Sequence, residues 1–229
     1  MAAFEFPKAF IFDMDGLIFD SEVLYFEACQ RAAAQLGYTV DQSLFLQLVG
    51  RSNDSAEAFF LEVFGATFPV RQFDRLWDAE WHSLFNTKGI AFKPGLLSLL
   101  DWLEHHTIPK AVGTSSRQEE AHQCLKATGI FERFSTVVTV DQVSAGKPAP
   151  DIFLEAARRL NIAPQNCLVL EDSNAGVMAA QAAGMSVVMV PDLQSPAPQS
   201  RAIARQIFPS LIEVHQWLEA AIAPSPSSP

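Results

Sequence analysis

The sequence has few cysteines, few basic residues and no long apolar run, and each shortage excludes a class of protein. The three cysteines, Cys29, Cys124 and Cys167, lie inside apolar segments without metal-ligand spacing, so we expect reduced packing residues rather than disulfides or a metal site. No stretch approaches the roughly 18 uninterrupted apolar residues of a membrane span. The 16 Lys and Arg residues against 26 Asp and Glu residues give a formal charge of -10, which opposes binding to nucleic acid.

The first apolar run, residues 9–12, does not resemble a secretory signal, because no basic segment precedes it and Asp13 and Asp15 follow it. We therefore expect a cytoplasmic protein. The partner class that remains is a small anionic molecule, bound where local cations and backbone donors overcome the negative field. The sequence carries no oligomer signal, so a monomer is the default expectation.

Short β-branched runs alternate with helical patterns along most of the chain. Strands are expected at residues 8–13, 109–114, 136–140, 167–171 and 186–190. Apolar spacing typical of helices covers residues 96–103 and 153–160, and a further helix is expected at 175–183, where Gly184 ends it. This alternation predicts an α/β fold with a doubly wound, Rossmann-like parallel sheet that binds ligands at the carboxyl ends of its strands.

The interval 20–92 breaks the alternation because it contains only helical signals, including one stripe of Ala56, Phe59, Phe60, Val63 and Phe64. A crossover between parallel strands needs only about a dozen residues. We therefore expect an inserted helical domain at 20–92 and a core domain made of residues 1–19 and 93–222. The last segment, 223–229, is rich in Pro and Ser, and disorder is expected there.

Asp13 and Asp15 lie two residues apart at the end of the first expected strand, so extended geometry points both carboxylates to one side. At about 4 Å and an effective dielectric constant near 20, two such charges repel by about 4 kcal/mol. Mg²⁺, which prefers carboxylate, carbonyl and water oxygens, would compensate this repulsion. The alternative is a simple turn, because Asp and Gly are common turn residues.

Polar residues follow two other expected strands and should lie at the same edge of a parallel sheet. Glu171 and Asp172 end one strand, with helix capping by Asp172 or Ser173 as the alternative. Thr114 ends another and precedes Ser115 and Ser116, whose hydroxyls suit either phosphate or a helix cap.

Lys147, in the sequence AGKPAPD, suits a phosphate site as a cation, although an isolated lysine is usually solvated surface. The dipeptide GK does not belong to a Walker A loop, because Pro148 stands where Ser or Thr is needed.

Taken in order, the DMDG tetrapeptide at 13–16, Thr114, Lys147 and the ED pair at 171–172 resemble the four motifs of the haloacid dehalogenase superfamily. Within it, DMDGLIFDSE, GKPAPDIF and LEDSNAGVMAAQAAG resemble the β-phosphoglucomutase group, and residues 167–192 resemble pseudouridine 5′-phosphatase-like members. The resemblance covers nearly the whole chain. It implies the core fold described above, with residues 20–92 as a helical cap.

The resemblance also implies roles. Asp13 would be the nucleophile and Asp15 the general acid and base. Magnesium would be held by Asp13, the Asp15 carbonyl and Asp172, with Glu171 in support. The transferred phosphoryl group would be held by Thr114, Ser115 and Lys147. The reaction implied is hydrolysis of a small phosphomonoester, a sugar phosphate or a nucleoside phosphate, through a phospho-aspartyl intermediate.

Two other functions remain open. A sugar phosphomutase would return the phosphoryl group to a second hydroxyl; against it, the cap lacks the histidine that mutase-like members carry, and Tyr25 stands near that place. A non-catalytic phosphate-binding or regulatory protein would keep the fold without turnover. The candidate substrate-selecting cap residues are Glu22, Tyr25, Arg51 and Asn53, for which packing or solvated surface is an equal alternative.

Overall fold

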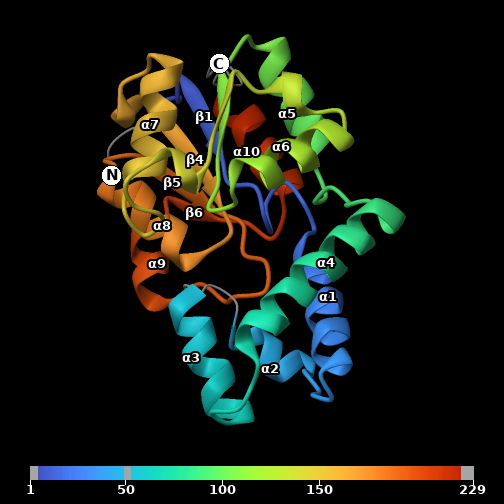
Figure 1. The fold of residues 1–229 in the computed structure, drawn as a ribbon. Coiled ribbons are helices and arrows are strands. Elements are labelled where there is room, and N and C mark those ends of the chain that lie inside the picture. Colours follow the sequence, from blue (N-terminus) through green and yellow to red (C-terminus); the bar gives the residue numbers. More distant parts are fainter. Residues whose placement is uncertain (1–4, 49–52, 223–229) are drawn as a thin grey trace, which may run out of the picture. The chain divides into compact units, whose positions relative to one another are not determined.

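The computed structural model describes residues 5–48 and 53–222, without the side chains of residues 53–55 (Figure 1). The chain divides into two compact units, one made of the residues up to Phe19 and from Phe92 onward, the other of Asp20–Ala91. No helix in the described ranges is both long and apolar enough to cross a membrane. The tail at 223–229, for which disorder was predicted, lies outside these ranges.

The first unit is built on a parallel sheet, as the sequence predicted, with six strands where five were expected. Its strands are β1 (Ala9–Phe12), β2 (Lys110–Gly113), β3 (Thr136–Val138), β4 (Cys167–Glu171), β5 (Ser186–Met189) and β6 (Gln206–Ile207). Their order is β3-β2-β1-β4-β5-β6, and every neighbouring pair is parallel. The carboxyl ends of all the strands therefore lie along one edge of the sheet.

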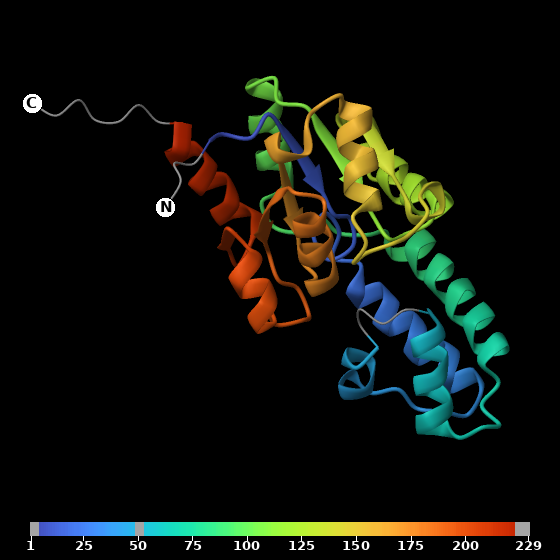
Figure 2. The same cartoon turned by 90° about the vertical axis from the view of Figure 1, so that its left-hand side faces the viewer.

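Helices cover both faces of this sheet (Figures 1 and 2). They are α5 (Leu96–His105), α6 (Gln118–Ala127), α7 (Asp151–Leu160), α8 (Asn174–Ala182), α9 (Pro198–Ile203) and α10 (Leu211–Ile222), with short 3-10 turns at Phe131–Arg133, Val140–Gln142 and Pro164–Asn166. Because side chains alternate along a strand, Ile11 and Val169 pack with Phe153 and the small residues of α7 and α8. On the opposite face α5 packs against α10. Burial on both faces explains why the strands are apolar throughout.

Two expectations for this unit need correction. The third strand ends at Val138 rather than at residue 140, because Val140–Gln142 turns into a 3-10 helix. The two-residue strand β6 was not predicted, since Gln206–Ile207 is too short to show a period. All three cysteines are buried and free, as predicted.

The second unit contains α1 (Glu22–Gln35), α2 (Gln42–Leu46), α3 (Asn53–Phe64) and α4 (Val70–Lys88), and α1 packs against α4. Its core is aromatic and includes Phe59, Phe60 and Phe73. The stripe predicted on α3 is confirmed for Phe59 and Phe60, and Ala56 and Phe64 pack against the same core. Val63 was wrongly placed on that stripe, because it is 42% exposed.

The chain leaves and re-enters the sheet unit through two adjacent segments. Phe19 and Phe92 form an antiparallel bridge, and their rings stack with centroids 5.8 Å apart. On either side, the Lys93 N–H donates to the Ile18 carbonyl and the Asp20 N–H donates to the Ala91 carbonyl, both at 2.9 Å. These contacts form a short two-stranded ribbon.

Candidate active site

The carboxyl edge of the sheet collects polar side chains from three adjacent strands. Asp13 directly follows β1, and its N–H donates to the Leu170 carbonyl of β4 at 2.9 Å. Thr114 directly follows β2 and is buried, and Glu171 is the last residue of β4. The parallel register pairs Phe12 with Val112 and with Leu170, so Asp13 and Glu171 lie at the same level and Thr114 lies one residue further along.

Lys147 reaches this edge from the loop before α7. Its ammonium group donates to Asp13 Oδ1 and, at 2.5 Å, to Glu171 Oε1. The lysine side chain is 5% exposed, and it also lies over the Phe153 ring, 4.9 Å from the centroid. Lys147 is therefore a buried cation between two carboxylates and not a solvated surface lysine.

Glu171 is fully buried and both of its oxygens have partners. Oε1 accepts from Lys147, while Oε2 accepts from the Ser173 N–H at 2.7 Å and from its hydroxyl at 2.9 Å. A Cβ on Gly176 would lie 1.7 Å from Oε1, so only glycine leaves room for this carboxylate at the start of α8. The helix itself is capped by Ser173, whose hydroxyl accepts from the Gly176 N–H at 3.0 Å. The capping alternative thus holds for Ser173 and not for Asp172.

The acidic groups outnumber the cation that contacts them. Ligand oxygens of Asp13, Glu171 and Asp172 lie within 4.8 Å of one another. Burial raises the pKa of Asp13 to about 8, with Glu171 adding to this effect and Lys147 opposing it. Burial, followed by the charges of Glu171 and Asp13, raises the pKa of Asp172 well above its ordinary value. Burial lowers the pKa of Lys147, but the charges of Asp13 and Glu171 outweigh this effect and raise the pKa.

This arrangement fits a hard divalent cation. The donor set consists of carboxylate oxygens, which Mg²⁺ prefers, and three ionised carboxylates with one ammonium leave a net charge of about -2 for the cation to neutralise. Gly16 keeps space open beside Asp172, because a Cβ there would lie 2.4 Å from Asp172 Oδ2. Asp13 and Asp172 are the better placed ligands, since both oxygens of Glu171 are already bonded.

Asp15 is connected to the end of β2 through a residue outside the predicted set. The Ser116 hydroxyl donates to Asp15 Oδ2 at 2.6 Å, and the Ser116 N–H donates to Thr114 Oγ1 at 3.0 Å. The sequence did offer a signal, because Ser116 was one of three consecutive hydroxyl residues. Ser115 is exposed, and no contact within the described ranges links its side chain to the carboxylates.

The candidate cap residues belong to the other unit. Glu22 and Tyr25 lie on α1, where the Tyr25 ring stacks on Trp81 with centroids 5.7 Å apart. The Tyr25 carbonyl accepts from Trp77 Nε1 at 3.0 Å. Asn53 begins α3, but its side chain and the whole of Arg51 lie outside the described residues. Packing therefore accounts for part of what Tyr25 does, and substrate selection stays a prediction for all four.

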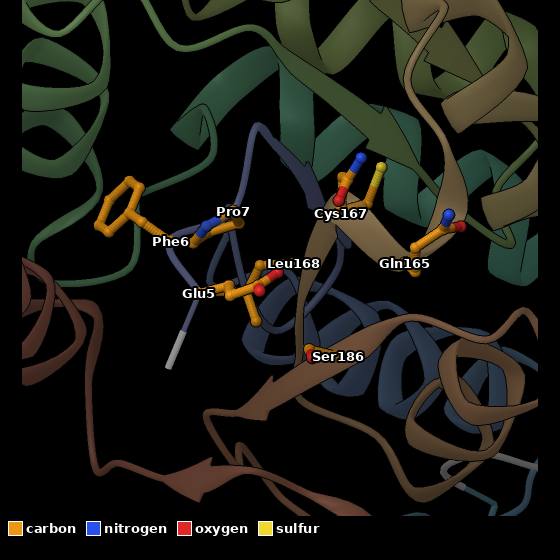
Figure 3. Close-up of a pocket in the computed structure, with 8 residues that line it drawn as sticks. Glu5, Phe6, Pro7, Gln165, Cys167, Leu168 and Ser186 are labelled. Carbon is orange, nitrogen blue, oxygen red and sulfur yellow. The ribbon is translucent and has the colours of Figure 1, made fainter. Parts of the chain in front are cut away.

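A small hollow of about 30 Å³ lies at the opposite edge of the sheet (Figure 3). Its lining includes Pro7, Cys167 and Ser186, which stand at the amino ends of β1, β4 and β5. A space of this size suits about one water molecule. The hollow is thus separate from the polar edge and too small for a substrate.

Comparison with known proteins identifies the family. The model of the haloacid dehalogenase-like hydrolase family matches residues 10–190, which is most of the chain. The chain belongs to the haloacid dehalogenase-like hydrolase family. The match contains every sequence-predicted site residue, so the expected superfamily resemblance is confirmed.

Proteins with similar sequences or structures carry different names. The (DL)-glycerol-3-phosphatase 2 of Arabidopsis thaliana is 38% identical over 213 residues, which cover 89% of this chain and 87% of that protein. The phosphorylated carbohydrates phosphatase of Thermotoga maritima is 33% identical over 178 residues, covering 78% and 82%. The β-phosphoglucomutase structure from Clostridium difficile has a TM-score of 0.76 and 26% identity, covering 94% and 96%.

Proposed function

We propose that this chain hydrolyses a small phosphomonoester with the help of Mg²⁺, through a phospho-aspartyl intermediate on Asp13. Family membership, together with relatives named as phosphatases, makes it a phosphoric monoester hydrolase of small phosphorylated substrates. The observation that carries the finer proposal is the group formed by buried Asp13 and Glu171, the Lys147 side chain and half-buried Asp172 at the carboxyl edge of the sheet. It offers a nucleophile, a fixed cation and oxygen ligands for a metal within a few ångströms.

In the first step the Asp13 carboxylate attacks phosphorus, and the bond to the substrate oxygen breaks. Asp15 donates a proton to the departing alkoxide. The hydrogen bond that Asp15 Oδ2 accepts from Ser116 would orient this carboxyl group for the transfer. Asp15 then accepts a proton from the water that hydrolyses the phospho-aspartate, which returns both residues to their starting states.

Lys147, Thr114 and Ser115 hold the phosphoryl oxygens in this proposal. Lys147 is fixed by two carboxylates and the Phe153 ring, so little reorganisation is needed when negative charge develops on the phosphoryl group. Asp13, the Asp15 carbonyl and Asp172 would hold Mg²⁺, and Glu171 would support its waters. When bound, the cation supplies positive charge that lets a carboxylate approach an anionic ester.

The substrate class is a sugar phosphate, a nucleoside phosphate or a similar small ester. We propose that residues 20–92 form the cap that selects the leaving group, with Glu22, Tyr25, Arg51 and Asn53 as the candidate contacts. A cytoplasmic location and a monomeric state stay predictions from the sequence.

The test is phosphate release from a panel that includes glycerol 3-phosphate, glucose phosphates and pseudouridine 5′-phosphate, with Mg²⁺ or with a chelator. Turnover should require Mg²⁺, and Asp13→Asn should reduce it to background while the circular dichroism spectrum stays that of a folded protein. Turnover that survives in Asp13→Asn, or that ignores the chelator, would refute the mechanism.

The likeness to a β-phosphoglucomutase structure favours a second candidate, a sugar phosphomutase. Incubation with β-glucose 1-phosphate and a bisphosphate activator distinguishes the two, because a mutase forms glucose 6-phosphate without net release of phosphate. A regulatory protein without turnover would bind phosphate in calorimetry and release none from any ester in the panel.

A further inference from the structure

Asp192, just beyond β5, carries a half-buried carboxylate that the proposed mechanism does not use. Its Oδ1 accepts from the Lys93 ammonium at 2.7 Å, and the two side chains are 12% and 20% exposed. Its Oδ2 is buried and has no hydrogen-bond partner among the described residues. A buried oxygen without a hydrogen bond is costly, so its environment calls for a donor.

The unpartnered oxygen lies near Asp172, one of the three carboxylates of the candidate cation site. A Cβ placed on Gly16 would lie 2.4 Å from Asp172 Oδ2 and 3.3 Å from Asp192 Oδ2. Both oxygens thus lie close to one point, within reach of one bridging water. Asp192 also adds to the raised pKa of Asp172, after the larger effects of burial and of Glu171 and Asp13.

The backbone fixes where this carboxylate stands. Asp192 follows β5, which is hydrogen-bonded to β4 up to the pair Glu171 and Met189, and the Val190 N–H donates to the Glu171 carbonyl at 2.7 Å. Lys93 is fixed in turn by its N–H bond to the Ile18 carbonyl. Lys93 contacts Oδ1, and Oδ2 is the oxygen that lies near Gly16. Asp192 lies beyond the residues 10–190 that match the family.

We propose that Asp192 is an outer-sphere positioning residue of the cation site, whose Oδ2 accepts a hydrogen bond from a water ligand of bound Mg²⁺. The inference rests on the metal site of the proposed function. Such outer partners typically change metal affinity about 10–100-fold when they are lost. The competing explanation is that Asp192 only forms an ion pair with Lys93.

The experiment is a calorimetric titration of the full chain with Mg²⁺ alone, in the absence of substrate. Asp192→Asn removes the charge and the acceptor, and the dissociation constant for Mg²⁺ should rise about tenfold. Lys93→Met breaks the same ion pair but keeps the carboxylate, so the dissociation constant for Mg²⁺ should change by less than about threefold. Glu132→Gln, in the turn before the amino end of β3, controls for the loss of one negative charge. Thermal melting without metal shows whether each variant is folded.

A dissociation constant for Mg²⁺ in Asp192→Asn within about twofold of the wild-type value would overturn the inference. An equal loss of Mg²⁺ affinity in Asp192→Asn and in Lys93→Met would overturn it too, because that result marks a purely structural ion pair. If Asp192→Asn does not fold, the same titration of Asp192→Glu decides, since a displaced carboxylate should also weaken binding. A wild-type protein that binds Mg²⁺ but hydrolyses nothing in the panel would refute the proposed function and leave this inference standing. A wild-type protein that binds no Mg²⁺ would overturn the inference about Asp192.

Discussion

Replacing Lys147 by methionine is the perturbation for which the structure gives the clearest magnitude. Methionine has a similar length and can still lie against Phe153, so Lys147→Met removes a charge and little volume. Removing one partner of a buried ion pair costs about 3–5 kcal/mol, because the other charge stays buried. Here Asp13 and Glu171 lose their shared cation together, and their side chains are 8% and 0% exposed.

The cost should depend on pH in a definite direction. A carboxyl group whose folded pKa is raised favours the fold while it is protonated, and this stability is lost as the pH rises through the folded pKa. For Asp13 the pKa in the folded protein is about 8 with Lys147 present. This stability is therefore lost from about pH 4, near the ordinary pKa of an aspartate, upward. We expect Lys147→Met to lose about 3–5 kcal/mol near pH 9 and less than about 2 kcal/mol near pH 5, where protons replace the missing cation.

The assay is urea unfolding of both proteins at the two pH values, with and without Mg²⁺. Mg²⁺ should restore part of the lost stability near pH 9. Phosphate release should fall about 10²–10³-fold even in the restored protein, because a fixed cation at the phosphoryl group is missing. A loss of under about 1 kcal/mol near pH 9, typical of an exposed pair, or a loss independent of pH, would refute this account of the charge balance.

Three further predictions follow from the same geometry. As the pH is raised toward 8, Mg²⁺ affinity should increase by up to about tenfold per pH unit, because the cation must displace the Asp13 proton. Calorimetric titration in buffers of different ionisation enthalpy should show this proton release. Gly16→Ala should weaken Mg²⁺ binding at least about tenfold by displacing Asp172, whereas Gly129→Ala, at a similar positive φ with open space around it, should only lower the melting temperature. Ser116→Ala should lower kcat about tenfold with little change in KM and shift the alkaline limb of the pH–rate profile, where the general acid loses its proton. An unchanged profile would exclude a role for Ser116 beside the general acid.

The sheet and its polar edge could be predicted because the strands are short, apolar and buried on both faces. Cys167–Glu171 matches its predicted bounds completely, since an apolar run ends there at the pair of acidic residues 171 and 172. The strand at Gln206–Ile207 could not be predicted, because two residues show no period and owe their pairing to β5. Val63 shows a different limit: its spacing fits the helical stripe, but its place relative to the aromatic core is set by tertiary packing.

The site was predictable where a residue directly ends a strand, as Asp13, Thr114 and Glu171 do. The contacts made around these residues were not. Ser116 reaches Asp15 across 101 positions of sequence, and Lys93 reaches Asp192 across 99. Such partners depend on where loops return to the sheet, and no local pattern records that.

The ribbon that pairs Phe19 with Phe92 bears on how the enzyme can be taken apart. Chain ends that are bridge partners can be joined by a tight hairpin loop of about 2–5 residues, so the sheet unit need not contain the helical insertion to keep its own connectivity. Excising residues 20–91 and closing the gap with such a loop would test the phosphate chemistry of the sheet unit by itself. Any preference among esters that disappears on excision, while phosphoryl transfer to water persists, would then belong to the excised helices.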